Sequence, residues 1–187
     1  MGQHVANEPE FDEDNRDSGQ VWLVGFRLDP DRDIDQEGAD VYCLLLESRD
    51  EGPVTREGYT IFFKDVSRAG EALRMDDDET VRAMTPPSEV HYIYDLAEFS
   101  YAVTSEDGQV DSQDAIINCL NVVFDLVKAT ELPFPEDYKR VLYALADYMT
   151  FCSDLDQYLR ENDVTRTQIR DGILWMIGVV VSRSKLI

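Results

Sequence analysis

The chain is poor in the residues that catalytic and metal sites use most often. Its 187 residues include two histidines, His4 and His91, and three cysteines, Cys43, Cys119 and Cys152, with no C-x-x-C pair. Three widely spaced cysteines exclude a disulfide framework and a zinc site of the usual spacing, so we expect reduced core residues. A cysteine or serine nucleophile would have to use His91, which lies among aromatic residues and which we expect to be structural.

Signature motifs are missing as well. The sequence contains no G-x-S-x-G, no Walker motif, no G-x-G-x-x-G and no H-E-x-x-H. Carboxylates are so abundant that any pair could be chosen as an acid and a base, and no single pair is therefore informative. We expect a non-catalytic protein that needs no cofactor.

Long apolar runs are also absent. The longest, Ile173 to Val181, is too short to cross a bilayer, which takes about 20 residues. Residues 1–20 are polar and acidic, unlike a signal peptide. We expect a soluble, cytoplasmic protein that makes no membrane contact.

What the chain has in excess is negative charge. It carries 39 Asp and Glu against 17 Lys and Arg, for a formal charge of -22. Residues 1–20 hold six acids and one Arg, residues 21–85 hold sixteen acids and eight bases, and residues 86–187 hold seventeen and eight. The acidity is therefore a property of the whole chain and not of one polyanionic segment.

The choice of charged residues is biased too. Asp outnumbers Glu 24 to 15, and Arg outnumbers Lys 13 to 4. At about 1 M salt the Debye length is only about 3 Å, so self-repulsion within such a chain is screened. This composition is typical of proteins from salt-accumulating organisms, although a high-GC genome would also favour Arg and Asp. We expect a salt-adapted protein.

The order of the predicted elements, strands first and helices second, indicates an α+β fold. We expect residues 1–20 to form a flexible acidic tail, residues 21–107 a β-rich region with short helices, and residues 108–187 a helical region that packs with the sheet as a single domain. We expect a small, mostly antiparallel sheet of three to four strands in the N-terminal half, packed against a C-terminal layer of about four helices. The predicted strands are Val21 to Leu28, Val41 to Ser48, Tyr59 to Phe63 and Val90 to Tyr94. Alternation in the first places Val24 and Phe26 on one face and Val21 and Leu23 on the other, and the second is nearly continuous in apolar residues, which predicts burial on both faces.

Capping residues predict where the helices begin. Candidate caps are Asp65, Asp95, Ser112, Ser153 and Thr165, the last in a capping box with the glutamine three residues later. The final helix is apolar on all sides through its middle, which predicts a place at the centre of the helical layer.

Four aromatic residues give the main candidate for a partner-binding site. Tyr92, Tyr94, Phe99 and Tyr101 are dense where a predicted strand joins a helix. Aromatic residues are common anchors at protein interfaces, but packing between a sheet and its helices is the more frequent reason for such a cluster. The hypothesis is a protein-binding adaptor or accessory subunit with a protein partner, or a homodimer.

Two alternatives involve nucleic acid or its mimicry. Residues 154–176 resemble a helix-turn-helix, with Arg166, Gln168 and Arg170 at the start of the second helix. A regulator of this kind would contact phosphates against the field of an acidic domain, so nucleic acid is the less favoured partner. The other alternative is an acidic inhibitor or nucleic-acid mimic that binds a basic partner.

The densest acidic stretch raises the question of calcium. Its acids occupy positions 1, 3, 5, 7, 9 and 12 of a calcium-loop count, but Ile34 stands at position 6, where an EF-hand needs glycine. We expect a solvated hairpin loop and no metal, with Asp29, Asp31 and Asp33 as the weak alternative ligands. The acids in that count are Asp29, Asp31, Asp33, Asp35, Glu37 and Asp40.

Overall fold

The computed structural model describes residues 19–29, 31, 38–47, 52–105, 113–152 and 154–187. Within these ranges the chain forms a seven-stranded mixed sheet and seven α-helices, which confirms the α+β class. Of the predicted tail, all but its last two residues lie outside the described ranges. The strands are β1 (Gln20–Arg27), β2 (Val41–Glu47), β3 (Gly52–Pro53), β4 (Thr55–Arg56), β5 (Tyr59–Phe63), β6 (Tyr92–Asp95) and β7 (Ser184–Leu186).

Helices follow the sheet strands and dominate the second half of the chain. Four of the seven described α-helices come after residue 108, as expected. A short 3-10 helix, Val66–Arg68, precedes the first. The α-helices are α1 (Ala69–Met75), α2 (Glu79–Arg82), α3 (Leu96–Thr104), α4 (Gln113–Lys128), α5 (Glu136–Phe151), α6 (Leu155–Asn162) and α7 (Arg166–Ser182).

The sheet is larger than the sequence predicted, and it is mixed. Its order is β4-β5-β2-β1-β6, with β3 paired to β2 and β7 paired to β5. β6 runs parallel to β1 because the chain crosses over through α1 and α2 before it returns, and β7 runs parallel to β5. The prediction of three to four strands was wrong because β3, β4 and β7 are too short to show an alternating pattern.

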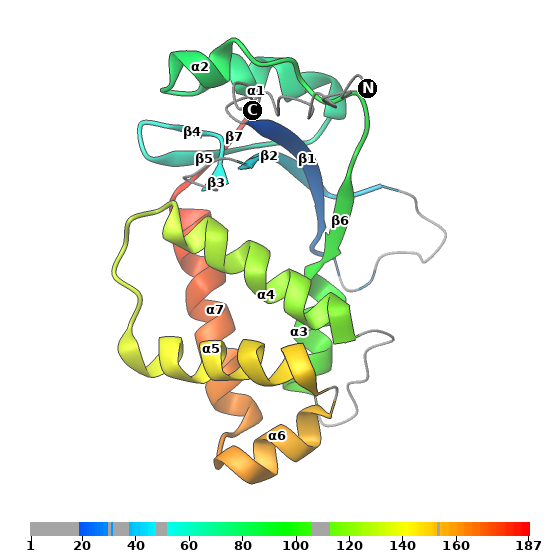
Figure 1. Ribbon diagram of the computed structural model, residues 1–187, viewed down its shortest axis with the longest axis vertical. Coiled ribbons are helices and arrows are strands. Elements are labelled where there is room, and N and C mark those ends of the chain that lie inside the picture. Colours follow the sequence, from blue (N-terminus) through cyan, green and yellow to red (C-terminus); the bar gives the residue numbers. More distant parts are fainter. Residues whose placement is uncertain (1–18, 30, 32–37, 48–51, 106–112, 153) are drawn as a thin grey trace, which may run out of the picture.

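Helices cover the sheet on both faces (Figure 1). α1 and α2 lie over the upper face, and α3, α4, α5 and α7 lie below it, with α6 farthest from the sheet. Side chains of β1 alternate as predicted: Val24 and Phe26 belong to the lower apolar cluster, and Val21 and Leu23 to the upper one. This alternation, with a period of two, splits one strand between two cores.

β2 contributes to both cores as well. Cys43 belongs to the lower cluster and Leu44 to the upper one, and both are fully buried. Burial of one such aliphatic side chain contributes about 1.5–3 kcal/mol. The nearly continuous apolar run of this strand therefore reflects burial on both faces, as its sequence indicated.

Most predicted helix caps are confirmed. The carboxylate of Asp65 accepts a hydrogen bond from the Ser67 N–H at 2.9 Å, and that of Asp95 accepts one from the Glu98 N–H at 2.8 Å. Thr165 forms the predicted capping box. These bonds satisfy N–H groups that have no partner within the helix.

Two predicted caps need separate comment. The cap of α6 is Asp154, whose carboxylate accepts a hydrogen bond from the Gln157 N–H at 2.8 Å, and not the serine before it. A carboxylate at this position also favours the positive end of the helix dipole. The predicted caps Ser112 and Ser153 lie outside the described residues.

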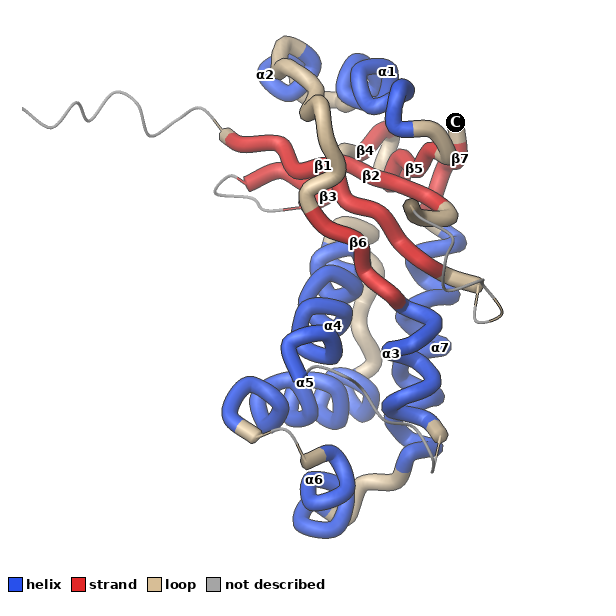
Figure 2. The backbone as a smooth tube through the Cα atoms, turned by 90° about the vertical axis from the view of Figure 1, so that its right-hand side faces the viewer, coloured by secondary structure: helices blue, strands red, loops and turns tan. Residues whose placement is uncertain are grey.

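The last helix does not lie wholly inside the helical layer. α7 runs beside α3 at the margin of the molecule (Figure 2). Its Leu174 is 58% exposed and its Val181 68% exposed. The expectation of a central helix is met in part, because α7 packs on α3, α4 and α5 but has one side that faces solvent.

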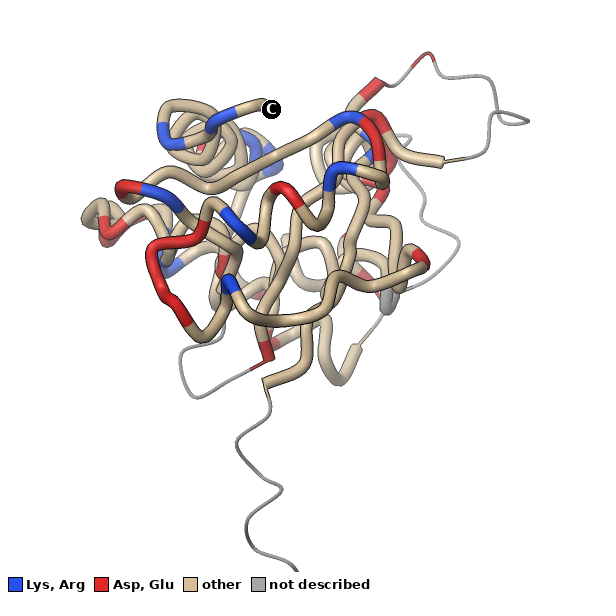
Figure 3. Tube along the Cα trace, turned by 90° about the horizontal axis from the view of Figure 1, so that it is seen from above, with Lys and Arg blue, Asp and Glu red and all other residues tan. Residues whose placement is uncertain are grey.

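Charged residues surround the described chain on several sides (Figure 3). Acidic and basic positions are interspersed around the outline seen from above, with one longer acidic stretch among them. Ion pairs such as Arg68–Glu71, at 2.8 Å, are exposed and contribute little, about 0–1 kcal/mol each. The arrangement matches the even distribution of acids along the sequence.

Candidate functional site

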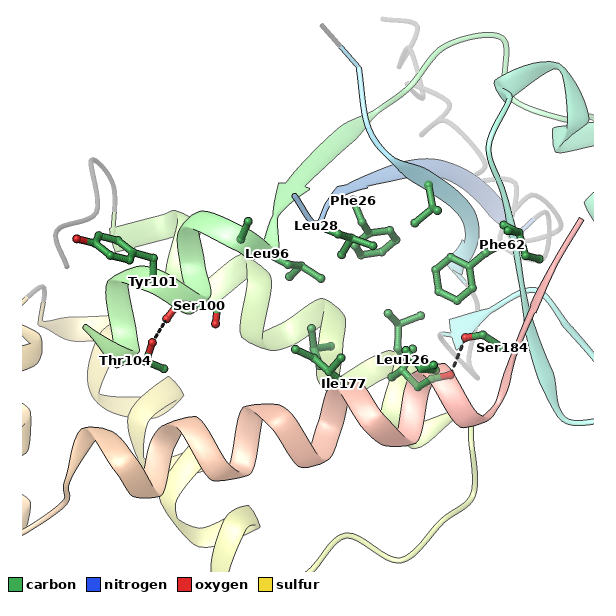
Figure 4. A pocket seen from close by; sticks show the side chains of 16 residues that line it. Phe26, Leu28, Phe62, Leu96, Ser100, Tyr101, Thr104, Leu126, Ile177 and Ser184 are labelled. Carbon is green, nitrogen blue, oxygen red and sulfur yellow. Dashed lines mark hydrogen bonds between the residues drawn. The ribbon is translucent and has the colours of Figure 1, made fainter. Parts of the chain in front are cut away.

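An apolar groove opens between the lower face of the sheet, α3 and α7. Its volume is about 650 Å³. Side chains from these three parts of the fold point into one space, and Val123 and Leu126 of α4 close it from behind (Figure 4). We call this hollow the apolar groove.

The side chains that line the apolar groove follow the periodicities of the strands and helices that carry them. Phe26 of β1 and Phe62 of β5 both project from the lower face, and their ring centroids are 5.9 Å apart. On α7, Ile177 and Val181 are one helical turn apart and reach the groove together. On α3, Leu96, Ser100 and Thr104 follow the same spacing of four residues.

Exposed apolar side chains gather around this groove. Among the described residues, eleven large apolar side chains are exposed, and five of them line the groove. Contiguous apolar surface of this kind marks protein-interaction sites or ligand-binding grooves, whereas scattered exposed residues are ordinary. The five are Leu28 (50% exposed), Tyr101 (55%), Ile177 (39%), Val181 (68%) and Leu186 (55%).

The lining offers little polar chemistry. The described residues that line the groove include no Asp, Glu, Lys, Arg or His. Two of its hydroxyls already donate to helix carbonyls: Thr104 of α3 to the Ser100 carbonyl at 2.6 Å, and Ser184 of β7 to the Val180 carbonyl of α7 at 2.6 Å. The groove is therefore suited to hold an apolar group and not to transfer protons.

The four predicted partner-binding residues do not form one patch. Phe99 is buried in the lower core, and Tyr101 lies at the apolar groove. Tyr92 and Tyr94 are in contact, with ring centroids 4.5 Å apart, and Tyr94 also stacks on Phe26 at 5.6 Å. Their density in the sequence does not translate into density on the surface, because strand and helix direct them to different sides.

A second, smaller hollow lies beside Tyr92 and Tyr94. It has a volume of about 370 Å³ and is bordered by Trp22 of β1 and Asn118 of α4. The Asn118 amide donates to the Tyr92 hydroxyl at 3.3 Å. Burial, followed by nearby Tyr92, raises the pKa of Tyr94 to about 12, so its hydroxyl remains neutral at ordinary pH.

His91 has a structural role in this hollow. The ring Nδ1 of His91 accepts a hydrogen bond from the Leu23 N–H at 3.1 Å, and the backbone N–H of His91 donates to the Leu23 carbonyl at 2.8 Å. Its ring packs edge-on against Trp22, with centroids 4.8 Å apart. His91 thus extends the pairing of β1 and β6 by one residue, and these contacts are consistent with the structural role expected of it.

The three cysteines differ in exposure. Cys43 and Cys119 are buried as expected, but Cys152 is exposed where the chain leaves α5. Burial raises the pKa of the Cys43 thiol, and burial together with Asp95 and Glu98 raises that of Cys119 to about 12. Both thiols are held in the unreactive protonated form.

Cys152 is therefore expected to be the only thiol that reacts quickly in the folded protein. Ellman's reagent should titrate about one thiol per chain under native conditions and all three after unfolding, because thiolate formation needs exposure. The variant Cys152→Ser should leave no rapidly reacting thiol. Fast reaction of two thiols in the native protein would contradict the burial of Cys43 and Cys119.

The predicted weak metal ligands lie at the start of the β1–β2 connection. Asp29 accepts a hydrogen bond from the Asp31 N–H at 3.0 Å, and the Asp40 carboxylate accepts one from the Leu28 N–H at 2.7 Å. These bonds stabilise the turn. Asp33 lies outside the described residues. Within the described ranges, no three His, Cys, Asp or Glu side chains gather closely enough to hold a metal ion.

The segment predicted to form a helix-turn-helix folds as two helices, α6 and α7, joined through Asp163, which has a positive φ of 52°. Its Arg166 donates to the Ala102 carbonyl at 3.2 Å, to the adjacent Val103 carbonyl at 3.3 Å and to the Asp156 carboxylate at 2.7 Å.

The other two residues of this alternative are more accessible. The side chain of Gln168 completes the capping box of α7, and Arg170 pairs with the neighbouring Asp171 at 3.2 Å. DNA binding stays a prediction, as does the binding of a basic partner by an acidic inhibitor. Of the three predicted DNA contacts, Arg166 is the least available, because its guanidinium already donates to three acceptors within the protein.

Comparison with known proteins yields no relative. The chain matches no known protein family, and neither the curated proteins nor the solved structures include a significant match. Among the described helices, none is long and apolar enough to cross a membrane. Inference about function therefore depends on the geometry of this chain.

Proposed function

We propose that the protein is a non-catalytic interaction or accessory protein whose apolar groove receives an apolar segment of a protein partner. The observation that carries the proposal is the coincidence of the groove with five exposed large apolar side chains. A partner that covers them removes apolar surface from water, at about 25 cal/mol per Å².

The surroundings of the groove support a protein partner. Interfaces commonly have an apolar centre and a polar rim, and the exposed Lys185, between the lining residues Ser184 and Leu186, can belong to such a rim. Three of the residues that line the groove, Leu28, Tyr101 and Val181, are at least half exposed, so a polypeptide can reach it from solvent. Of the four aromatic residues predicted to bind a partner, Tyr101 is placed to do so.

The proposed setting is the cytoplasm of a salt-adapted organism. The support is the charge: -22 in total, with each of the segments 1–20, 21–85 and 86–187 negative, and with more Asp than Glu and few lysines. Dissolved salt at about 1 M screens such charges but leaves apolar burial intact, so an interaction made through an apolar groove persists there.

Site-specific photo-crosslinking tests this proposal. A photoreactive phenylalanine analogue at Val181 is expected to form discrete covalent adducts with a partner in a native lysate at matched salt. The control is the same analogue at Phe151, which is 87% exposed but lies outside the groove. Equal adduct patterns from the two positions, or none from Val181, would contradict a partner-binding groove.

A further inference from the structure

We propose that the partner segment is an extended peptide of alternating apolar and acidic residues, which adds a strand to the outer edge of β7 and inserts its apolar side chains into the groove. This inference rests on the proposed function and specifies the kind of partner. It combines three features of residues 172–187. The outer edge of β7 has no neighbour among the described strands, the side chains of β7 alternate between the two faces of the sheet, and basic residues outnumber acidic ones.

The backbone of β7 has one unpaired side. Among the described strands β7 pairs with β5 alone. The Arg183 carbonyl accepts from the Thr60 N–H at 2.8 Å, and the Ile187 N–H donates to the Phe62 carbonyl at 2.9 Å. In a parallel ladder, alternate residues face the same neighbour, so Ser184 and Leu186 direct their N–H and C=O groups away from β5. An added strand can pair with these groups.

The side chains of β7 alternate between two environments. Ser184 and Leu186 point to the lower face and line the apolar groove. Lys185 is exposed, while Arg183 lies over the ring of Tyr59 at 5.7 Å. A strand beside β7 repeats this alternation, so one set of its side chains lies at the groove and the other set lies beside the two basic residues.

The charge of this part of the chain indicates which side chains of the added strand should lie beside the two basic residues. Residues 172–187 contain no Asp or Glu, and this is the longest run without acids in a chain that has 39 of them. The run carries two positive charges, Arg183 and Lys185. Opposite charges on neighbouring strands are favourable, so acidic side chains suit this face of the added strand.

The same features argue against two other occupants. A second copy that paired its β7 with this one would place basic residues opposite basic residues, and like charges in that position are destabilising. A partner helix could cover the groove, but its backbone groups are bonded within the helix and leave the edge of β7 unpaired. An extended acidic and apolar segment satisfies both the edge and the groove.

The probe is a labelled seven-residue peptide that alternates glutamate with valine or phenylalanine, titrated into the full chain by fluorescence anisotropy. A peptide of the same composition with its glutamates grouped at one end is the control, and it is expected to bind about tenfold more weakly. Binding of the alternating peptide should slow hydrogen exchange of the Leu186 amide by about tenfold or more.

Backbone methylation separates strand addition from docking by side chains alone. In one derivative the glutamate nitrogens are methylated, and in the other the apolar residues' nitrogens. Only alternate residues of an added strand face β7, so one derivative should lose binding by about tenfold or more while the other retains it. Equal binding of both derivatives would overturn strand addition.

Variants of the protein test the charge and the edge. Lys185→Glu should weaken binding of the glutamate peptide about tenfold and strengthen binding of a matched lysine peptide. Leu186→Pro removes an outward N–H, whereas Leu186→Ala keeps it, so the proline variant should bind more weakly than the alanine variant. Circular dichroism checks that each variant is folded.

The outcomes distinguish the two proposals. If crosslinks form at Val181 but the alternating peptide neither binds nor protects Leu186, the groove has a partner of another kind and strand addition is wrong. If a concentration-dependent dimer accounts for the crosslinks, the occupant is a second copy and the peptide proposal is likewise wrong. If Val181 gives no crosslink, the proposed function itself fails.

Discussion

Gly25→Ala is expected to lower the free energy of unfolding by about 2–3 kcal/mol, at the upper end of the cost of overpacking a core. A Cβ at this position in β1 would lie 2.6 Å from the Cβ of Ala39 and 3.1 Å from the ring of Tyr42. Because the Ala39 Cβ is fixed to the backbone, the clash can be relieved only by moving the segment that enters β2.

That movement would break local hydrogen bonds. The Asp40 N–H donates to the Phe26 carbonyl at 2.9 Å, and the Asp40 carboxylate accepts from the Leu28 N–H at 2.7 Å. Thermal unfolding followed by circular dichroism should show a midpoint temperature lower by about 5–10 °C, and urea unfolding should show a lower midpoint concentration. The same loss in a variant with Ala39→Gly alone would point to backbone flexibility in place of a clash.

The double variant Gly25→Ala with Ala39→Gly supplies the control. It removes the Cβ that the new methyl group meets, so it should be more stable than the sum of the two single effects by about 1 kcal/mol or more. If the single variant does not fold, recovery of a folded double variant still supports the clash. Simple additivity of the two effects would contradict it.

Arg166→Ala is the second change with a large expected effect, a loss of about 2–3 kcal/mol of unfolding free energy. The Arg166 side chain is only 16% exposed, and its guanidinium donates to two carbonyls near the end of α3 and to Asp156 near the start of α6. Carbonyls at a helix end have no partner within the helix, so Arg166 joins three elements by satisfying them.

Two variants serve as comparisons. Arg166→Lys keeps the charge but cannot reproduce the planar fork, and it should recover only part of the loss. Arg170→Ala removes an arginine that pairs with its exposed neighbour, and it should change the unfolding free energy by no more than about 0.5 kcal/mol. Urea unfolding measures all three. Equal stability of the Arg166→Ala and Arg170→Ala variants would contradict the structural role.

The same pair of variants bears on DNA binding. Since Arg166→Ala changes stability, only Arg170→Ala gives a direct measure of a phosphate or base contact at this helix. Fluorescence anisotropy with duplex DNA at low salt is the measurement. Unchanged affinity in Arg170→Ala would remove the most accessible arginine from the predicted reading helix.

Local patterns predicted much of the fold. The faces of β1, the extent of β5 and the caps Asp65, Asp95 and Thr165 were correct, because each depends on residues a few positions apart. β3, β4 and β7 were missed because their pairing partners, and not their own sequences, make them strands. The sequence prediction also missed the turn between β4 and β5. Glu57 and Gly58 form it with positive φ angles of 54° and 74°, which suit a tight hairpin.

The groove could not be predicted in the same way. Its lining comes from strands and helices far apart in the sequence, so no window of residues contains it. Tyr101 was named for its aromatic neighbours along the chain, and it lies at the groove for a different reason, its place on α3. One usable signal was overlooked: residues 172–187 lack acids, and several of their apolar side chains are exposed.

The parallel pairing of β7 with β5 has a consequence for how the protein is made. Phe62 pairs with Leu186, so during synthesis β5 emerges long before its outer neighbour exists. Contacts between such distant residues form slowly. Until the whole helical region has been translated, the nascent chain presents the apolar strand β5 as an open edge, which is the state most exposed to aggregation. The edge of β5 is therefore protected only after residues 184–186 have been made.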